Sequence, residues 1–211
     1  MTSAQQIMQA TKNVASQLAQ ASTATKNEVL RHIASLLPIR ADEIIQANNE
    51  DIARAQADGV SESTQDRIRL DHARIQAIAD AVLEIVGLPD PIGDVVQGKT
   101  LPNLLKLTQI RVPLGVIGVI YEARPNVTID IAALGIKSGN ATILRGGRAA
   151  QSTNNVLVKL LQDALQHSGL SGELIQSLDE FGREGSVEMM RAIGLIDVLI
   201  PRGGAGLIKS V

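Results

Sequence analysis

Apolar positions in the first 88 residues recur at the spacing of amphipathic helices. The segment 25–28 (Thr-Lys-Asn-Glu) fits a capping box, and a one-sided apolar stripe follows it as far as Pro38. A second helix is expected from about 41 to 57. A third is expected from about 64 to 86, with an apolar stripe of Ile68, Ile75, Ile78, Val82 and Ile85. This part of the chain is therefore predicted to be helical.

The pattern changes after residue 88. Prolines and glycines between 89 and 100 predict an irregular connection, and residues 105–112 alternate as an extended strand does. Short apolar runs then alternate with helical segments. Strands are expected at about 115–120, 141–144, 174–178 and 197–201, and helices at about 127–138, 150–167, 183–193 and 204–211. This order predicts an α/β fold, a Rossmann-like open parallel sheet with flanking helices, preceded by a helical portion.

The carboxyl ends of these strands should meet at one edge of the sheet. Right-handed crossovers would bring together the loops after Ile120, Leu144, Leu178 and Pro201. The chain has no internal repeat and no flexible linker, so the helical portion is expected to pack against the sheet. We therefore expect the binding and catalytic residues to lie in one crevice at this edge.

Composition excludes several classes of function. The 211 residues are 45% hydrophobic and 20% charged, with a net charge of -2, as in a soluble protein with one core. One Tyr, one Phe and no Trp leave little for nucleobases to stack on, so nucleic acid is not an expected partner. No apolar run reaches the roughly 18 residues of a membrane span, and no signal peptide is evident, so a cytoplasmic location is expected. The chain has no Cys, and its three His lie far apart, so no metal site is expected.

Two glycine-rich turns follow predicted strands. Arg145, Gly146 and Gly147 lead into a helix, where glycines permit close backbone approach and a guanidinium can hold phosphate. Arg202, Gly203 and Gly204 repeat this arrangement at the last strand. Neither turn is a dinucleotide fingerprint or a Walker sequence. A tight turn with solvated arginines would explain the first equally well, and the residues of the second, taken alone, favour a tight strand-to-helix connection over binding.

A third polar turn runs from Glu122 to Asn126, before a helix expected to begin with Val127. The Asn126 amide could donate to a developing oxyanion, and Arg124 could hold a carboxylate or phosphate. The local alternative is that Asn126 caps the helix. The run from Asp179 to Glu184 is expected to be a solvated loop.

Three segments together resemble the aldehyde dehydrogenase superfamily and, within it, the glutamate-5-semialdehyde dehydrogenase family: residues 111–128, 144–147 and 197–204. The resemblance extends over nearly the whole chain but covers roughly the first half of the family's length. It implies an incomplete NADP-binding domain over 1–211. That domain comprises a helical portion at 1–88, an oligomerisation strand at 101–111 and an α/β core at 112–211. The catalytic domain, with its nucleophilic Cys beyond Val211, would be absent.

The resemblance also implies an activity, namely NADPH-dependent reduction of L-glutamyl 5-phosphate to L-glutamate 5-semialdehyde and phosphate in proline biosynthesis. Asn126 would be the catalytic donor to the oxyanion, and Arg124 would bind substrate. NADP would be bound by Arg145, Gly146, Gly147, Arg202, Gly203 and Gly204. A homo-oligomer is implied, and glutamate 5-kinase, which makes the substrate, is a candidate partner.

Two other interpretations agree with the sequence. The chain could be a noncatalytic nucleotide-binding or interaction module that keeps the fold without the catalytic half. It could also be complemented by a separate chain that carries the cysteine. Both agree with the absence of Cys from this sequence.

Overall fold

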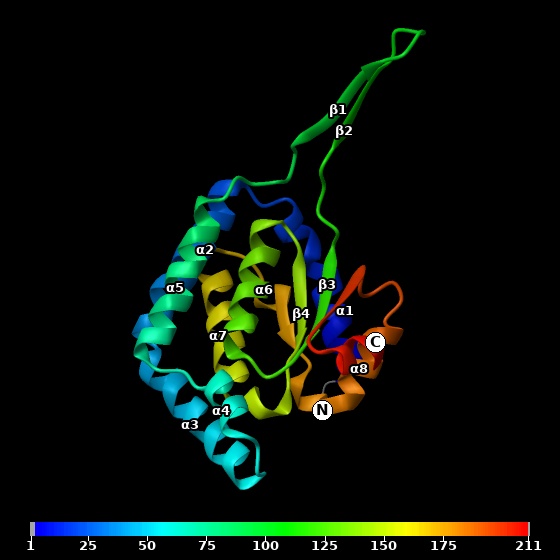
Figure 1. Ribbon diagram of the computed structural model, residues 1–211. Coiled ribbons are helices and arrows are strands. Elements are labelled where there is room, and N and C mark those ends of the chain that lie inside the picture. The colour runs from blue at the N-terminus through cyan, green and yellow to red at the C-terminus, as the bar shows by residue number, and fades with distance from the viewer. Residues whose placement is uncertain (1–2, 211) are drawn as a thin grey trace.

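The computed structural model describes residues 3–210, beginning with a helical portion (Figure 1). This portion consists of α1 (Ala4–Ala19), α2 (Thr23–Ile39), α3 (Ala41–Ala57), α4 (Glu62–Ile68) and α5 (His72–Gly87). Two strands, β1 (Val95–Thr100) and β2 (Lys106–Ile110), then form an antiparallel ribbon that projects from the body. In residues 3–210 no helix is long and apolar enough to cross a membrane.

The second part of the chain is the predicted parallel sheet, so the α/β fold class is confirmed. Its strands are β3 (Val116–Tyr121), β4 (Ala141–Arg145), β5 (Ile175–Ser177) and β6 (Val198–Arg202), in the order β5-β4-β3-β6. The helices that accompany them are α6 (Pro125–Lys137), α7 (Gln151–His167), α8 (Gly182–Arg191) and α9 (Ala205–Ser210). Short 3-10 turns are η1 (Arg148–Ala150), η2 (Gly172–Leu174) and η3 (Asp179–Phe181). The helix expected at 204–211 is α9, and Val211 lies outside the described residues.

The strand order places a topological switch point between β3 and β6. From β3 the chain moves to β4 and β5, and it then returns to the opposite side of β3 to form β6. In open α/β sheets the crevice for ligands lies outside the carboxyl ends of the strands where the order reverses. The exits of β3 and β6, at Tyr121 and Arg202, are neighbours in register.

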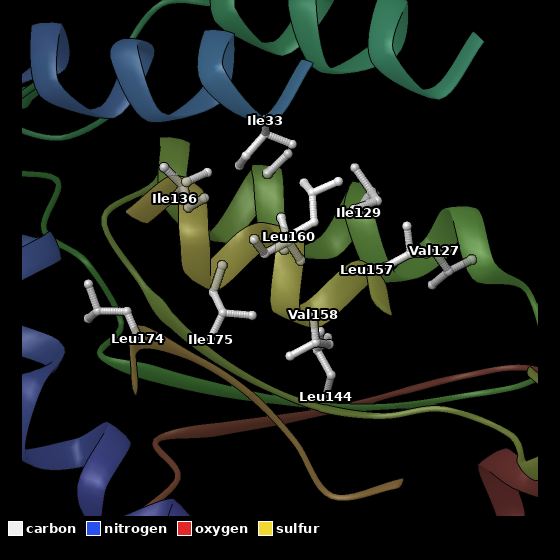
Figure 2. Close-up of a cluster of buried hydrophobic side chains, with 14 of the residues drawn as sticks. Ile33, Val127, Ile129, Ile136, Leu144, Leu157, Val158, Leu160, Leu174 and Ile175 are labelled. Carbon is white, nitrogen blue, oxygen red and sulfur yellow. The ribbon is translucent and has the colours of Figure 1, made fainter. Parts of the chain in front are cut away.

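The elements pack in layers around one apolar core (Figure 2). Helices α6 and α7 lie on one face of the sheet, and α2 and α5 cover these two helices from outside. Helix α1 packs against the other face and contacts β3, β4 and β5 directly. The buried core includes Ile33, Ile129, Leu144, Leu157, Leu160 and Ile175. The expected packing of the helical portion onto the sheet is therefore confirmed.

The helix expected over 64–86 is two helices, α4 and α5. The side chain of Asp71 accepts a hydrogen bond from the amide of Arg74 and so begins α5 afresh. The buried Asn48 side chain holds the break from both sides, since it donates to the carbonyl of Ile68 and accepts from the amide of Leu70. Asn48, which is distant in the sequence, therefore separates α4 from α5, and the apolar stripe alone does not predict this break.

Two further expectations at element ends were wrong. Helix α2 is capped by Ser22, whose hydroxyl accepts from the amide of Thr25, so the helix starts before the predicted capping box. Pro38 lies inside the last turn of α2.

Part of the irregular connection expected at 89–100 is strand β1, whose residues are all exposed and show no apolar alternation. Pairing with β2 makes this segment extended.

A buried charge cluster anchors the base of the ribbon. The ammonium group of Lys26, which is 2% exposed, lies 2.5 Å from Oδ2 of Asp90. Asp90 also accepts from the Thr23 hydroxyl and the Ile92 amide. Burial alone would raise the pKa of the Asp90 carboxyl, but Lys26 and these hydrogen bonds together hold that pKa below its usual range.

We predict that Asp90→Asn lowers the free energy of unfolding at pH 7 by about 3–5 kcal/mol, because Lys26 is left buried without its counter-ion. The folded-state pKa of Asp90 lies below its unfolded value, which is near 4. The stabilisation is therefore complete above that value and is lost as pH falls through the folded-state pKa.

Urea unfolding followed by circular dichroism between pH 7 and pH 3 tests this. The variant should show a flatter dependence of stability on pH than the parent. The exposed Asp58, changed to Asn, serves as the control and should leave the curve unchanged. Equal stability of Asp90→Asn and the parent at pH 7 would contradict the prediction.

Candidate functional site

The exits of β3 and β6 form a hollow of about 360 Å³, here called the switch-point hollow. Its lining residues are Glu122, Arg124, Arg202, Gly203 and Gly204. Oε1 of Glu122 accepts a hydrogen bond from the amide of Gly204 at 2.8 Å. Arg124 and Arg202 are exposed. Two guanidinium groups at a switch point are suited to holding a phosphate or a carboxylate.

A second hollow of about 550 Å³, here called the β4–α8 hollow, lies beside the exit of β4. It is lined by Ile120, Arg145, Arg183, Ser186, Val187, Met190, Gly206 and Leu207. Nε of Arg145 donates to the carbonyl of Gly182 at 3.0 Å, which fixes one edge of its guanidinium. The exposed Arg183, which the sequence analysis did not single out, joins Arg145 here. The hollow therefore combines two cations with apolar side chains.

Gly146 and Gly147 line neither hollow. Close packing explains why both positions are glycine. A Cβ atom at Gly146 would overlap the side-chain amide of Asn154 and approach the Tyr121 ring to 3.1 Å. A Cβ atom at Gly147 would lie 2.9 Å from the backbone nitrogen of Ala123. The two glycines thus let the loops after β3 and β4 approach each other closely.

A buried polar network holds these loops together. Asp179, which is 6% exposed, accepts from the amide of Gly146 at 2.6 Å and from the side chain of Asn154 at 2.8 Å. Asn154 accepts from the Thr128 hydroxyl, which in turn accepts from the Tyr121 hydroxyl. Burial, and then the charge of Asp179, raise the pKa of Tyr121 well above its usual range. The expectation of a solvated loop was wrong at Asp179, which is buried because it satisfies two internal donors.

A carboxylate of the protein itself occupies the first amides of α7. Asp51 on α3 is fully buried and accepts from the amides of Ser152 at 3.0 Å and Thr153 at 2.8 Å. It also accepts from the Thr153 hydroxyl and pairs with Arg54. The start of α7 therefore faces the carboxylate of Asp51 and needs no external anion.

Asn126 lies in the first turn of α6, which begins two residues earlier than expected because Pro125 is well suited to a first helical position. Arg124 is at the N-cap, and no side chain caps the helix, so the interpretation of Asn126 as a cap is wrong. Nδ2 of Asn126 donates to Oδ2 of Asp130 at 3.2 Å. Burial raises the pKa of Asp130, while Asn126 and Arg202 act in the opposite direction.

Asn126 and Asp130 line a third hollow of about 450 Å³, here called the α4–α5 hollow. The other lining residues are Asp66, Arg67, Arg69, Leu70, Arg74, Ala77, Ile78 and Ala81. None of these residues was predicted to belong to a site, because α4 and α5 are distant from Asn126 in the chain. Over residues 3–210, no group of three or more His, Asp or Glu side chains could hold a metal ion.

The structure thus brings Arg124 together with Arg202, Gly203 and Gly204, and it places Arg145 and Asn126 in two other hollows. This sheet, with its helices and its polar strand exits, has the fold of the aldehyde dehydrogenases. A probable aldehyde dehydrogenase from Listeria monocytogenes superposes with a TM-score of 0.76 at 16% identity, covering 98% of this chain and 43% of that one.

Relatives with higher sequence identity define the family within this class of proteins. The crystal structure of gamma-glutamyl phosphate reductase from Thermotoga maritima matches with a TM-score of 0.94 at 35% identity, covering 97% of this chain and 49% of that one. The gamma-glutamyl phosphate reductase of Leifsonia xyli subsp. xyli is 55% identical over 202 residues, or 96% of this chain and 48% of the relative. No family model matches the sequence. The chain belongs to the gamma-glutamyl phosphate reductase family, and it spans about half the length of the curated relatives it matches.

We predict that Gly146→Ala destabilises the protein by about 1–3 kcal/mol, because the new methyl group must displace an Asn154 side chain that is hydrogen-bonded on both sides. The melting temperatures of Gly146→Ala and the parent measure the effect. Gly87→Ala is the matched control, since a Cβ atom there meets no atom within 4 Å. Equal melting temperatures for the Gly146 and Gly87 variants would refute the packing explanation.

Proposed function

We propose that this chain forms the cofactor-binding part of an enzyme that reduces L-glutamyl 5-phosphate to L-glutamate 5-semialdehyde and releases phosphate. The observation that carries the proposal is the meeting of Arg124, Arg202 and Gly203 at the switch point in a chain whose relatives are named gamma-glutamyl phosphate reductase. The chain has no Cys, so a cysteine nucleophile would come from outside these 211 residues.

The cofactor in this proposal is NADPH, which supplies the hydride when bound. Arg145 and Arg183 would grip the 2′-phosphate of its adenosine part, and Val187 and Met190 provide apolar surface in the same hollow. Arg202 would hold the pyrophosphate in the switch-point hollow, and Gly203 and Gly204 would permit its close approach to the backbone. Gly146 and Gly147 act indirectly, because they permit the loop geometry that carries Arg145.

Asn126 is proposed as the donor that stabilises the oxyanion formed at the reacting carbonyl carbon. Its side-chain amide has two N–H groups, and one of them donates to Asp130. The other N–H is then available for substrate, and Asp130 orients the amide. Arg124 is proposed to hold the phosphate or carboxylate of the substrate from the neighbouring hollow.

The ribbon of β1 and β2 is proposed to join subunits in a homo-oligomer. Both strands are exposed along their length, and apolar side chains on them and at the turn between them remain uncovered, including Val95, Val96, Leu104, Leu105 and Leu107. An exposed strand edge with such side chains favours pairing with another chain.

Phosphate-dependent NADPH formation from glutamate semialdehyde tests the function as a whole. The assay uses the protein that contains this chain and runs the proposed reaction in reverse. NADPH formation that requires added phosphate is the expected result. NADPH formation at the same rate without phosphate, or none with it, would overturn the proposal.

We predict that Arg145→Ala weakens NADPH binding by about 10- to 100-fold, the range expected for a lost hydrogen bond to a charged group. NADH lacks the 2′-phosphate, so its dissociation constant should not change. Fluorescence titration of both cofactors measures this. Arg191→Ala, at the exposed end of α8, is the control and should affect neither. Equal weakening of both cofactors would show that Arg145 does not recognise the 2′-phosphate.

We predict that Asn126→Ala lowers kcat by about 10²- to 10³-fold with little change in KM, since the lost interaction strengthens only in the transition state. Steady-state kinetics in the reverse direction measures both constants. Asn126→Asp keeps the shape but lacks the N–H donors, so it should be equally impaired. Full activity of either variant would exclude the proposed role.

A further inference from the structure

The α4–α5 hollow contains two arginines that take part in none of the ion pairs made around it. Arg74 is occupied, because it donates to the carbonyls of Asp66 and Arg69 at 2.7 and 2.8 Å and pairs with the carboxylate of Asp66 at 2.9 Å. Arg67 and Arg69 are exposed and have no such partner in residues 3–210. Arg74 therefore fixes the turn between α4 and α5, and this turn brings Arg67 and Arg69 to the hollow.

The remaining walls of this hollow differ in character. Ala77, Ile78 and Ala81 from successive turns of α5 form an apolar wall. The start of α6 contributes Asn126 and the partly buried carboxyl of Asp130. Cationic, apolar and carboxylate surfaces thus line one space of about 450 Å³.

This combination matches a short α-amino acid better than a simple anion. Guanidinium groups bind a carboxylate in a bidentate manner, and a carboxylate accepts from an ammonium group. Methylene groups between the two ends would lie against the alanines of α5. A phosphate group alone would be repelled by Asp130, and an uncharged aldehyde would leave both arginines without a partner.

We propose that the α4–α5 hollow binds the amino-acid end of the substrate. Arg67 and Arg69 hold its α-carboxylate, Asp130 accepts from its α-ammonium group, and the reacting carbon lies at Asn126. This inference rests on the proposed function, since it assigns residues to the substrate of that reaction. It makes the hollow the source of selectivity for a γ-semialdehyde of an amino acid over other aldehydes.

The test compares three aldehydes in the phosphate-dependent reaction of the protein that contains this chain. Glutamate semialdehyde carries both charged groups, 4-aminobutanal lacks the carboxylate, and 5-oxopentanoate lacks the ammonium group. The double variant Arg67→Ala/Arg69→Ala should raise KM by about 10- to 100-fold for the two carboxylate-bearing aldehydes. Its KM for 4-aminobutanal should stay unchanged, and that activity also reports that the variant is folded.

Asp130→Asn should give the complementary result. Its KM should rise for glutamate semialdehyde and 4-aminobutanal and stay unchanged for 5-oxopentanoate. Because Asp130 also orients the Asn126 amide, kcat should fall with all three aldehydes. A KM for glutamate semialdehyde and 4-aminobutanal equal to that of the parent would overturn the ammonium assignment. Arg191→Ala is the matched control and should leave all three KM values unchanged.

The outcomes separate this inference from the function on which it rests. A parent protein that forms NADPH without dependence on phosphate, or not at all, would refute the proposed function. An active parent whose arginine variants keep the parent's KM for glutamate semialdehyde, or lose activity equally with all three aldehydes, would refute the inference alone.

Discussion

The site depends on carboxylates that satisfy backbone amides at the ends of strands and helices. Asp179 accepts from the amide of Gly146 where β4 ends, and Asp51 accepts from two amides where α7 begins. Asp197 does the same where β3 begins, accepting from the amide of Val116 and pairing with Lys12 of α1. Each carboxylate comes from a distant segment, so these contacts fix the loops relative to one another. A buried amide without such a partner would cost free energy comparable to a lost hydrogen bond.

This arrangement determines which groups remain for ligands. Two backbone amides near the strand exits already have carboxylate acceptors: Gly146 donates to Asp179, and Gly204 donates to Glu122. Anionic ligands would therefore be held mainly by arginine side chains. The hollows contain Arg124 and Arg202, Arg145 and Arg183, and Arg67 and Arg69. A guanidinium supplies charge and paired donors without displacing the contacts that hold the fold.

The sequence predicted what depends on local pattern and missed what depends on distant partners. The four parallel strands and α3 follow from short apolar runs and a one-sided stripe, and their predicted positions are confirmed within a few residues. The break between α4 and α5 depends on Asn48, twenty residues earlier, and β1 depends on its pairing with β2. The position of Arg124, Arg145 and Arg202 at strand exits could be predicted because strand ends are visible in the sequence. Arg67, Arg69 and Arg183 could not be predicted, because the packing of α4, α5 and α8, which the sequence pattern does not reveal, places them at the hollows.

Asp130 relates the α4–α5 hollow to the switch-point hollow, as the proposed reaction requires. It lies on α6 one turn after Asn126 and accepts a hydrogen bond from that amide. It lines the α4–α5 hollow, and burial raises its pKa, a rise that the hydrogen bond from Asn126 and the charge of Arg202, from the switch-point hollow, partly offset. A charge bound at Arg202 would therefore change the electrostatic environment of Asp130, and through it that of Asn126. In the proposed arrangement, cofactor phosphate on one side and an amino-acid group on the other would each change the electrostatic environment of this carboxyl.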